Sequence, residues 1–296
     1  MRVIFMLDDK QEEHYLQLII KYRKEINMDI KFRKLIYKIG IIHRLCIKFV
    51  QMQNDVFFGK IQNRSFSIRK LPLNIRENKR RCFIVGNGPS LRISDLELIK
   101  FEDCFAANLI FKVFPKTKWR PKYYCIADRY ARTGDFIETA DLPFLFIGDY
   151  FWRTRGCNNK NAYCFHSERI NMGEEVKFSL DIKNKLYDCC TITYIMLQIA
   201  MYLEYKEIYL LGIDHNYPFT FDENGKPIMN SNVKEAHFFK DERPDEVIGN
   251  VLMMEKAYIK AKEVADKLGI KIYNATRGGK LEVFERVNLD EVKNVE

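Results

Sequence analysis

A glycine-rich turn that directly follows a short apolar run is the strongest chemical signal in the sequence. The run is Cys82 to Val85, and the turn reads Gly86-Asn87-Gly88-Pro89-Ser90. Glycines let a backbone approach an anion closely, and a helix expected from Leu91 to Lys100 would present N–H groups and a partial positive charge to it. The turn therefore predicts a phosphate-binding site. Its spacing is neither the dinucleotide-binding motif nor the P-loop, and a plain strand-to-helix turn would also explain it.

Polar residues recur where the other predicted strands end. They are Asn108, Asp128, the pair Asp214-His215, and the run Asn274 to Lys280 with Arg277. Each could simply cap a helix. Open α/β sheets, however, bind ligands outside the carboxyl ends of their strands, so these residues are expected to converge on one site.

Two histidines are candidates for proton transfer, because imidazole titrates closest to neutral pH. His237 lies in Glu235-Ala236-His237-Phe238-Phe239, within a stretch rich in turn residues, and His166 has the weaker claim. The alternative for His237 is an ordinary surface residue.

The elements that must position these residues alternate between short apolar runs and longer helical stretches. Strands are expected at 82–85, 104–107, 123–127, 144–147, 207–212 and 271–274, and helices at 191–203 and 247–268. This order predicts an α/β fold, with a mostly parallel nucleotide-binding sheet and helices on both faces. The stretch 148–188 is expected to be an irregular flank of the site, and 217–246 a long loop or lid.

The N-terminal part of the chain differs in charge from the rest. Residues 1–81 hold 19 Lys and Arg against 8 Asp and Glu, which leaves 30 against 32 in the remainder. Apolar spacing predicts helix over 11–52, so we divide the chain into a basic helical extension, 1–80, and a catalytic domain, 81–296. The basic helix could be a solvated face packed on that domain, or residues 1–60 could contact the inner-membrane surface. No nucleic-acid-binding module accompanies the charge, so nucleic acid is not an expected partner.

Length and composition support a globular enzyme. The 296 residues are 47% hydrophobic, which suffices for a sizeable core. No apolar run approaches the roughly 18 to 20 residues that cross a bilayer, and Asp8 and Asp9 interrupt the start, so a cytoplasmic location is expected. The eight cysteines lack CxxC or metal-ligand spacing, so we expect no metal site and reduced thiols.

Several landmarks, taken in order, resemble the bacterial family-42 sialyltransferases from about Arg81 to Phe284. These are Gly86 to Leu91, Asn108, Tyr205 to Asp214, and His237. Together with Trp119 to Tyr124 and Asn274 to Phe284, they resemble more closely a family of bacterial cell-surface biosynthesis proteins. That family is grouped with the archaeal MptE-like 6-hydroxymethylpterin pyrophosphokinases.

The resemblance implies a fold that binds a CMP-sugar without requiring a metal cofactor. Gly86 to Ser90 and Asn108 would hold the donor nucleotide, His237 would be the general base, and Tyr217 would steady the departing phosphate. The sialyltransferases carry an arginine shortly before the helix that precedes the Gly-Ile-Asp strand, and this chain has Cys189-Cys190-Thr191 in that stretch, which leaves sugars other than sialic acid open. Thr191, Asp128, Asn274 and Arg277 complete the expected binding residues, and Asp214 completes the catalytic ones.

Three functions follow as hypotheses. The first is a glycosyltransferase that moves a sugar from a nucleotide donor to a cell-surface glycan or glycolipid acceptor. The second is a diphosphokinase that moves pyrophosphate from ATP to a hydroxymethylpterin, which would need Mg²⁺ held by carboxylates such as Asp128 and Asp214. The third is a nucleotide-binding protein without turnover. A homo-oligomer is compatible with each of them.

Overall fold

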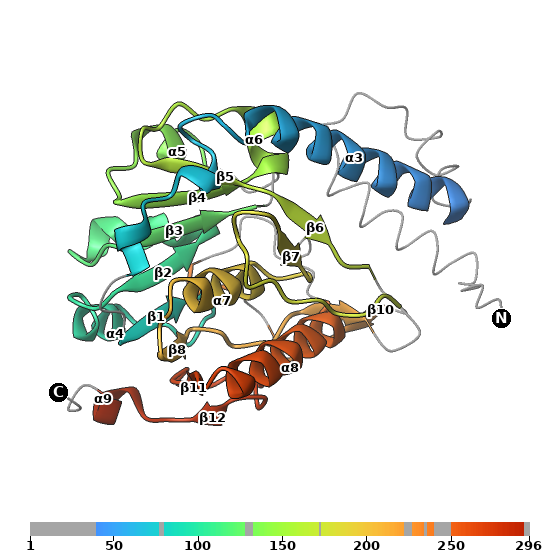
Figure 1. Ribbon diagram of the computed structural model, residues 1–296. Helices are drawn as coiled ribbons and strands as arrows, with labels where there is room; N and C mark the ends of the chain where they lie inside the picture. Colours follow the sequence, from blue (N-terminus) through green and yellow to red (C-terminus); the bar gives the residue numbers. More distant parts are fainter. Residues whose placement is uncertain are drawn as a thin grey trace.

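One eight-stranded sheet, in which every strand pairs in parallel with its neighbours, forms the centre of the protein (Figure 1). The computed structural model describes residues 40–76, 80–127, 133–171, 173–221, 227–233, 236–239 and 250–292. The strand order is β12-β11-β8-β1-β2-β3-β4-β5. The strands are β1 (Arg81–Val85), β2 (Cys104–Ala107), β3 (Tyr123–Ile126), β4 (Phe144–Gly148), β5 (Ala162–Phe165), β8 (Glu207–Leu211), β11 (Lys271–Asn274) and β12 (Glu285–Arg286).

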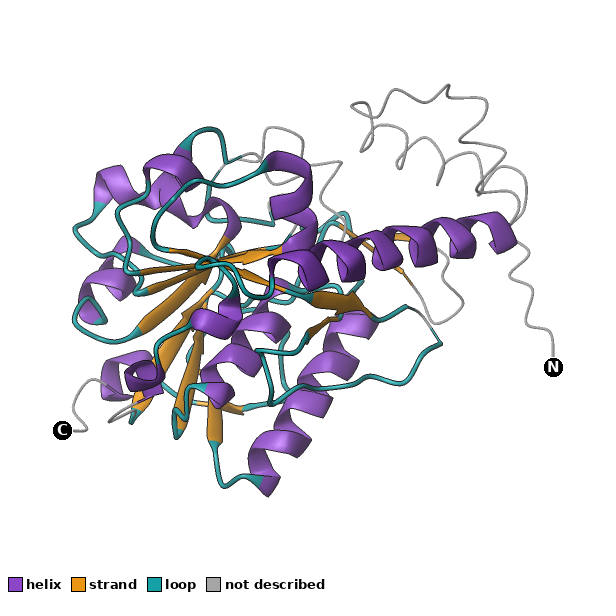
Figure 2. Cartoon of the chain, turned by 45° about the horizontal axis from the view of Figure 1, so that its top comes forward, coloured by secondary structure: helices purple, strands orange, loops and turns teal. Residues whose placement is uncertain are grey.

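Helices cover both faces of this sheet (Figure 2). The α-helices are α3 (Gly40–Ile61), α4 (Ile93–Leu98), α5 (Phe136–Thr139), α6 (Asp149–Arg155), α7 (Ile192–Tyr202), α8 (Val251–Lys267) and α9 (Leu289–Val292), and the 3₁₀ helices are η1 (Ile68–Lys70), η2 (Leu73–Arg76) and η3 (Asn108–Lys116). The central strands β1 to β4 and β8 are almost wholly buried, as a parallel sheet covered on both faces requires.

The strand order reverses between β1 and β8. From β1 the chain proceeds outward through β2, β3, β4 and β5, whereas β8, β11 and β12 extend from the other side of β1. Because such crossovers are right-handed, the helices of the two halves lie on opposite faces, and the loops after β1 and β8 diverge at the carboxyl edge. This reversal is where open α/β sheets bind their ligands.

The structure confirms the predicted α/β class and every predicted sheet strand to within a residue. It differs at two stretches. The flank expected to be irregular contains α6, the sheet strand β5, and a small parallel pair, β6 (Ser167–Arg169) with β7 (Leu186–Asp188). The expected lid contains an antiparallel pair, β9 (Phe219–Phe221) with β10 (Pro227–Met229). These strands have at most four residues and are separated by charged residues and asparagines, so the alternation of apolar residues that predicts a strand is hard to recognise there.

The helix α3 rests on α6 at one end and extends away from the body of the protein at the other (Figures 1 and 2). The predicted helix over 11–52 is confirmed from residue 40 onward, and its earlier part lies outside the described residues. Arg153 in α6 donates to Asn54 Oδ1 at 3.0 Å, and Gln51 Nε2 donates to the Ser167 carbonyl at 3.2 Å. No helix in the described part of the chain combines the length and apolar character that crossing a membrane requires.

The turn after β1 and the loop after β8 touch with no room for a side chain between them. A Cβ built on Gly86 would lie 2.4 Å from the Gly212 carbonyl oxygen and 2.4 Å from Ile213 Cδ1. One built on Gly88 would lie 2.7 Å from the same carbonyl and 1.8 Å from Asp214 Oδ2. Both glycines are therefore required by packing, whatever else the turn binds.

Gly86→Ala is expected to lower the free energy of unfolding by about 3 kcal/mol, because the added methyl group meets a backbone carbonyl that cannot move without displacing β8. The matched control is Gly59→Ala in α3, where a Cβ meets nothing within 4 Å and the helical position favours alanine by about 0.5–1 kcal/mol. Urea denaturation measures both, and equal stabilities would contradict the close contact.

Candidate functional site

The carboxyl ends of β8, β1 and β2 are adjacent and carry most of the residues predicted from the sequence. Asp214 and His215 follow β8, the turn Gly86 to Ser90 follows β1, and Asn108 follows β2. The N-terminus of α7 lies at this edge too, because α7 leads back to the start of β8. Asp128 follows β3 and lies outside the described residues.

The backbone of the glycine turn is already hydrogen-bonded within the protein. Gly86 N–H donates to the Leu211 carbonyl at 2.8 Å, and Gly88 N–H donates to the Gly212 carbonyl at 2.9 Å. Leu91 N–H donates back to the Gly88 carbonyl at 3.1 Å. The helix that follows, α4, has only six residues and begins at Ile93. The turn therefore ties β1 to β8, and these amides are not available to a ligand.

The carboxylate of Asp214 occupies the position beside the turn where an anion was expected. Its Oδ2 accepts from the Ser90 hydroxyl at 2.8 Å, and its Oδ1 accepts from the Ser90 N–H at 3.3 Å. Burial raises the pKa of Asp214, against the hydrogen bonds from Ser90, which lower it. The protein thus supplies its own carboxylate to the donors that were predicted to bind phosphate.

Two buried asparagine oxygens remain without a hydrogen-bond partner among the described residues: Asn87 Oδ1 and Asn108 Oδ1. The orientation of the Asn87 amide is fixed, because its Nδ2 donates to the Ala107 carbonyl at 3.1 Å. Asn108 has a left-handed backbone with φ of 54°, and its carbonyl accepts from the Tyr124 hydroxyl. An unsatisfied buried acceptor costs about 1–3 kcal/mol, so these two oxygens call for a ligand or water that donates hydrogen bonds.

The segment that carries His237 contacts the glycine turn. Phe238 N–H donates to the Asn87 carbonyl at 2.8 Å, which fixes His237 next to the end of β1. The half-buried imidazole stacks on Phe239 with ring centroids 5.0 Å apart, and Lys112 Nζ from η3 lies 4.6 Å from the Phe239 ring centroid. The structure therefore brings together His237, Asn87 and a lysine that the sequence had not indicated.

His215 is buried, and neither of its ring nitrogens has a hydrogen-bond partner within the described part of the chain. Its backbone is left-handed with φ of 52°, and its ring packs edge-on against Tyr258 of α8, with centroids 5.6 Å apart. Burial lowers the pKa of His215 to about 4, so the ring is neutral at pH 7. The sequence indicated this residue only by its place after a strand.

Tyr217 and Thr191 lie on the α7 and α8 side of the same edge. Tyr217 packs against the core, and burial raises the pKa of its hydroxyl, with smaller contributions from Tyr258 and Asp214. Thr191 is the N-cap of α7: its Oγ1 accepts from Thr193 N–H at 3.3 Å and lies 3.5 Å from the Tyr258 hydroxyl. Its hydroxyl therefore caps α7, whether or not it also binds a ligand.

Asn274 and Arg277 are engaged with the protein itself. Asn274 is fully buried and bridges the Leu281 carbonyl, at 2.8 Å, and Thr276 N–H, at 3.0 Å. Arg277 Nε contacts the fully buried Asp95 at 2.7 Å, while its terminal nitrogens contact Asp290. The hydrogen bonds that Arg277 donates to Asp290 and Asp95 raise its pKa. These contacts fold the loop after β11 against α4 and α9.

A surface hollow of about 370 Å³ lies along α8 and shares no residue with this edge. It is lined by Glu255, Ile259, Lys262, Glu263, Asp266, Glu282 and Val283. None of the predicted site residues lines this hollow. We therefore place the candidate site at the strand ends. No three His, Cys, Asp or Glu side chains among the described residues form a group that could hold a metal ion.

The buried imidazole of His215 predicts a specific pH dependence of stability. Its folded pKa of about 4 lies below the ordinary value of 6.5, so between these values the unfolded chain binds a proton that the folded protein does not. Stability should therefore fall as the pH drops from 6.5 towards 4, by up to about 3 kcal/mol from this residue. His215→Asn, which tolerates the left-handed backbone, should lose less stability than the parent between pH 7 and pH 5 in urea titrations. Equal losses in the two proteins would show that burial does not lower the pKa of His215.

A sequence profile of the family described as "6-hydroxymethylpterin diphosphokinase MptE-like" matches residues 59–219. No curated protein matches the chain. Among solved structures, the chain is similar to the MAf glycosyltransferase from Magnetospirillum magneticum AMB-1, with 16% identity, a TM-score of 0.46, and coverage of 72% of this chain and 35% of that one. It is also similar to a mammalian sialyltransferase in complex with Gal-beta-1-3GalNAc-ortho-nitrophenol, with 11% identity, a TM-score of 0.42, and coverage of 93% and 88%.

The two structural similarities are distant, and the chain spans about a third of the MAf glycosyltransferase chain. The sequence profile is different in kind, because it matches more than half of the chain. The matched residues run from the end of α3 through β8 and include the glycine turn, Asn108 and Asp214, whereas His237 and the loop after β11 lie beyond them. This confirms the resemblance seen in the sequence: the chain belongs to the family of MptE-like 6-hydroxymethylpterin diphosphokinase proteins.

Proposed function

We propose that this protein is a transferase that takes a sugar from a nucleotide donor, with CMP as the expected nucleotide, and moves it to a cell-surface glycan or glycolipid acceptor. The donor would bind across the carboxyl ends of β8, β1 and β2. The observation that carries the proposal is the 2.8 Å hydrogen bond from Phe238 N–H to the Asn87 carbonyl, which places His237 at the turn where the strand order reverses. A residue whose backbone lies next to that reversal is close to any ligand that the sheet binds there.

In this proposal His237 is the general base. It would remove the proton from an acceptor hydroxyl while that oxygen forms a bond to the anomeric carbon of the donor sugar. The bond between that carbon and the phosphate oxygen would break, and the electron pair would leave with the phosphate. Tyr217 would donate a hydrogen bond to the departing phosphate, which its raised pKa favours because the hydroxyl remains protonated at neutral pH.

The buried oxygens of Asn87 and Asn108 support a donor with hydroxyl or amino groups. A nucleoside offers both kinds of hydrogen-bond donor. The phosphodiester of such a nucleotide-sugar offers none, and the nearby Asp214 carboxylate would repel its charge. We therefore place the nucleoside or sugar part of the donor at the turn.

Pyrophosphoryl transfer to a hydroxymethylpterin is the second candidate, and the family description is the observation that favours it. It would need Mg²⁺, for which Asp128 and Asp214 are the expected carboxylates. Both oxygens of Asp214 are already bonded to Ser90, and Asp128 lies outside the described residues. The described residues do not fit a magnesium site by themselves. A nucleotide-binding protein without turnover is the third candidate.

A membrane-bound acceptor would suit the exposed face of α3, and we propose that the enzyme works in the cytoplasm at the inner-membrane surface. Phe49, Met52 and Val56 recur at helical spacing and are each more than half exposed. The N-terminal segment that contains them carries the basic excess of the chain. An apolar stripe beside basic residues is typical of helices that lie on anionic lipid. We also propose that residues 1–80 form an extension separate from the catalytic domain, residues 81–296, and that the protein can form a homo-oligomer.

His237→Ala is expected to reduce kcat by about 10²- to 10⁴-fold while leaving the Kd for the donor nucleotide within a factor of a few, because the base acts on the acceptor. Transfer to a lipid-linked glycan acceptor, with calorimetry for binding, measures the two quantities. His237→Gln keeps a hydrogen-bonding side chain without a base of similar pKa, so it should be equally inactive. Full activity of either variant would remove His237 from the reaction.

The same assay with EDTA separates the first two candidates. Sugar transfer is expected to persist in the chelator, whereas transfer of pyrophosphate from ATP should stop. Loss of all transfer in EDTA, restored by Mg²⁺, would favour the diphosphokinase.

Substituting serine at Phe49, Met52 and Val56 together is expected to reduce co-flotation with vesicles that contain anionic lipid. The three side chains are the apolar surface that the helix would insert. Phe101→Ser is the control, because Phe101 is an isolated aromatic side chain with 93% of its surface exposed, in the turn between α4 and β2. Equal flotation of both variants and the parent protein would place the membrane contact elsewhere or dismiss it.

A further inference from the structure

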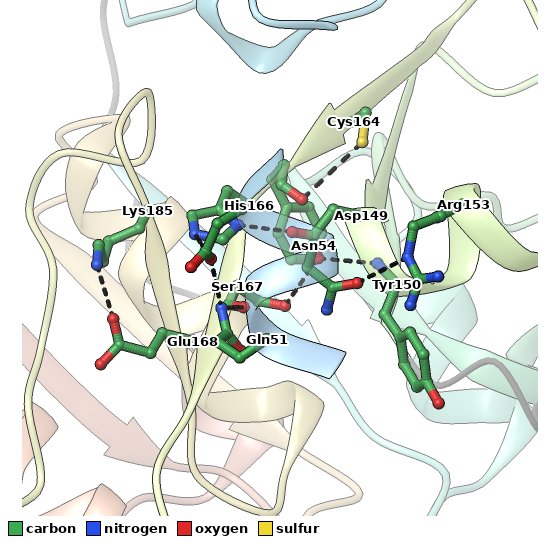
Figure 3. Close-up of polar contacts among 12 residues, drawn as sticks. Gln51, Asn54, Asp149, Tyr150, Arg153, Cys164, His166, Ser167, Glu168 and Lys185 are labelled. Atoms are coloured by element: carbon green, nitrogen blue, oxygen red, sulfur yellow. Dashed lines mark hydrogen bonds and ion pairs between the residues drawn. The ribbon is translucent and has the colours of Figure 1, made fainter. Parts of the chain in front are cut away.

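Two histidines are buried at the carboxyl edge of the sheet, and their surroundings differ in one respect. His166, after β5, has both ring nitrogens bonded: Nδ1 lies 2.6 Å from Asp149 Oδ2, and Nε2 lies 3.2 Å from Asp55 Oδ1 in α3 (Figure 3). Its ring also stacks on Phe58, with centroids 5.2 Å apart. His166 therefore anchors α3 to the sheet and has no capacity left for a ligand.

His215 is equally buried, with 9% of its surface exposed, yet both of its nitrogens lack a partner among the described residues. The neighbouring Tyr258 hydroxyl does not supply one, because it lies near Thr191 Oγ1 instead. A buried imidazole without hydrogen bonds destabilises the folded protein unless a bound molecule supplies those hydrogen bonds.

The backbone at His215 is a second, independent sign of a site. His215 and Asn108 are two of the four residues other than glycine that have positive φ in the described chain, and both carry a buried polar atom without a partner. They follow β8 and β2, the strands on either side of β1. Backbone strain and unsatisfied polar atoms that coincide at one sheet edge are typical of residues held in place for a ligand.

We propose that His215 contacts the substrate, and that its ring nitrogens bind an uncharged hydroxyl or amide group of the sugar or nucleoside. This rests on the proposed function, because it takes the substrate to lie across the ends of β8, β1 and β2. It adds a recognition residue on the β8 side of the turn, opposite the Asn87 and Asn108 side.

The chemistry of the ring determines the kind of group that it recognises. Since burial keeps the ring neutral at pH 7, one nitrogen donates a hydrogen bond and the other accepts one. Hydroxyl and amide groups can satisfy both roles. A phosphate could satisfy only the donor, and the Asp214 carboxylate on the preceding residue would oppose its charge. Discrimination by such a residue is strong, because a substrate that lacks the group leaves the imidazole unsatisfied.

The test compares His215→Phe with His166→Phe, a matched pair in which one histidine lacks partners and the other has two. Melting temperatures are measured first without ligand. His215→Phe should melt at or above the temperature of the parent protein, because it removes an unsatisfied polar ring, whereas His166→Phe should melt lower, because it leaves Asp149 buried without its partner. If His215→Phe does not fold, His215→Asn replaces it, since asparagine tolerates positive φ and its shorter amide cannot reach as far.

Calorimetry then gives Kd values for CMP, UDP, GDP, ADP and ATP, with and without Mg²⁺. For whichever nucleotide binds the parent protein, His215→Phe should raise Kd or the donor KM by about tenfold or more, and His166→Phe should not. A lower melting temperature for His215→Phe together with an unchanged Kd would overturn the proposal, because it would show a structural imidazole bonded to an internal water.

The failure of the proposed function is separable from this outcome. If no nucleotide binds the parent protein, the nucleotide-donor proposal fails, and His215 is judged on the melting temperatures alone. If His215→Phe then melts no lower than the parent protein, the result supports a site for another uncharged ligand. If it melts lower, the result excludes such a site.

Discussion

The contact between the turn after β1 and the loop after β8 is the constraint on which the site depends. Gly86 and Gly88 approach the Gly212 carbonyl so closely that no side chain fits, and their amides donate to Leu211 and Gly212. Asp214 completes the contact through Ser90, and its carbonyl accepts from Lys280 N–H at 2.7 Å, which holds the loop after β11 as well. Three loops thus become one rigid rim where the strand order reverses.

That rigidity changes the chemistry of the rim. Backbone amides and an aspartate bind the loops to each other. The buried side-chain atoms of this rim that have no hydrogen-bond partner among the described residues belong to Asn87, Asn108 and His215. The two amide oxygens are acceptors, and a neutral imidazole is both donor and acceptor. Such a set suits hydroxyl and amino groups better than a phosphate. The segment around His237 reaches the rim through one backbone hydrogen bond from Phe238, so the proposed base and the proposed recognition groups are carried by separate parts of the chain.

The other half of the sheet serves a different purpose. Beyond β3, the carboxyl edge carries Asp149 and His166, whose polar groups bind each other and the helix α3 (Figure 3). Buried charges there are satisfied, since a buried carboxylate that lost its partner would cost several kcal/mol. The same edge of one sheet therefore holds a helix at β4 and β5, whereas at β8, β1 and β2 it carries buried polar atoms that no described residue satisfies.

The sequence by itself determined the class of fold, the strand positions and the residues that follow them, because buried parallel strands are short apolar runs and the carboxyl ends of such strands share an edge. It missed β5, although Ala162–Phe165 is itself an apolar run, and it missed the pair of β9 and β10, whose strands have only three residues each. Only the tertiary structure decided which polar side chains retain hydrogen-bonding capacity. Arg277 is bonded to Asp95, 182 residues earlier in the chain, and Thr191 to its own helix, whereas the ring of His215 has no hydrogen-bond partner in the part of the chain that the structure describes. Residue type and spacing specify what a side chain can bind, but whether it is already bound depends on partners that only folding brings near.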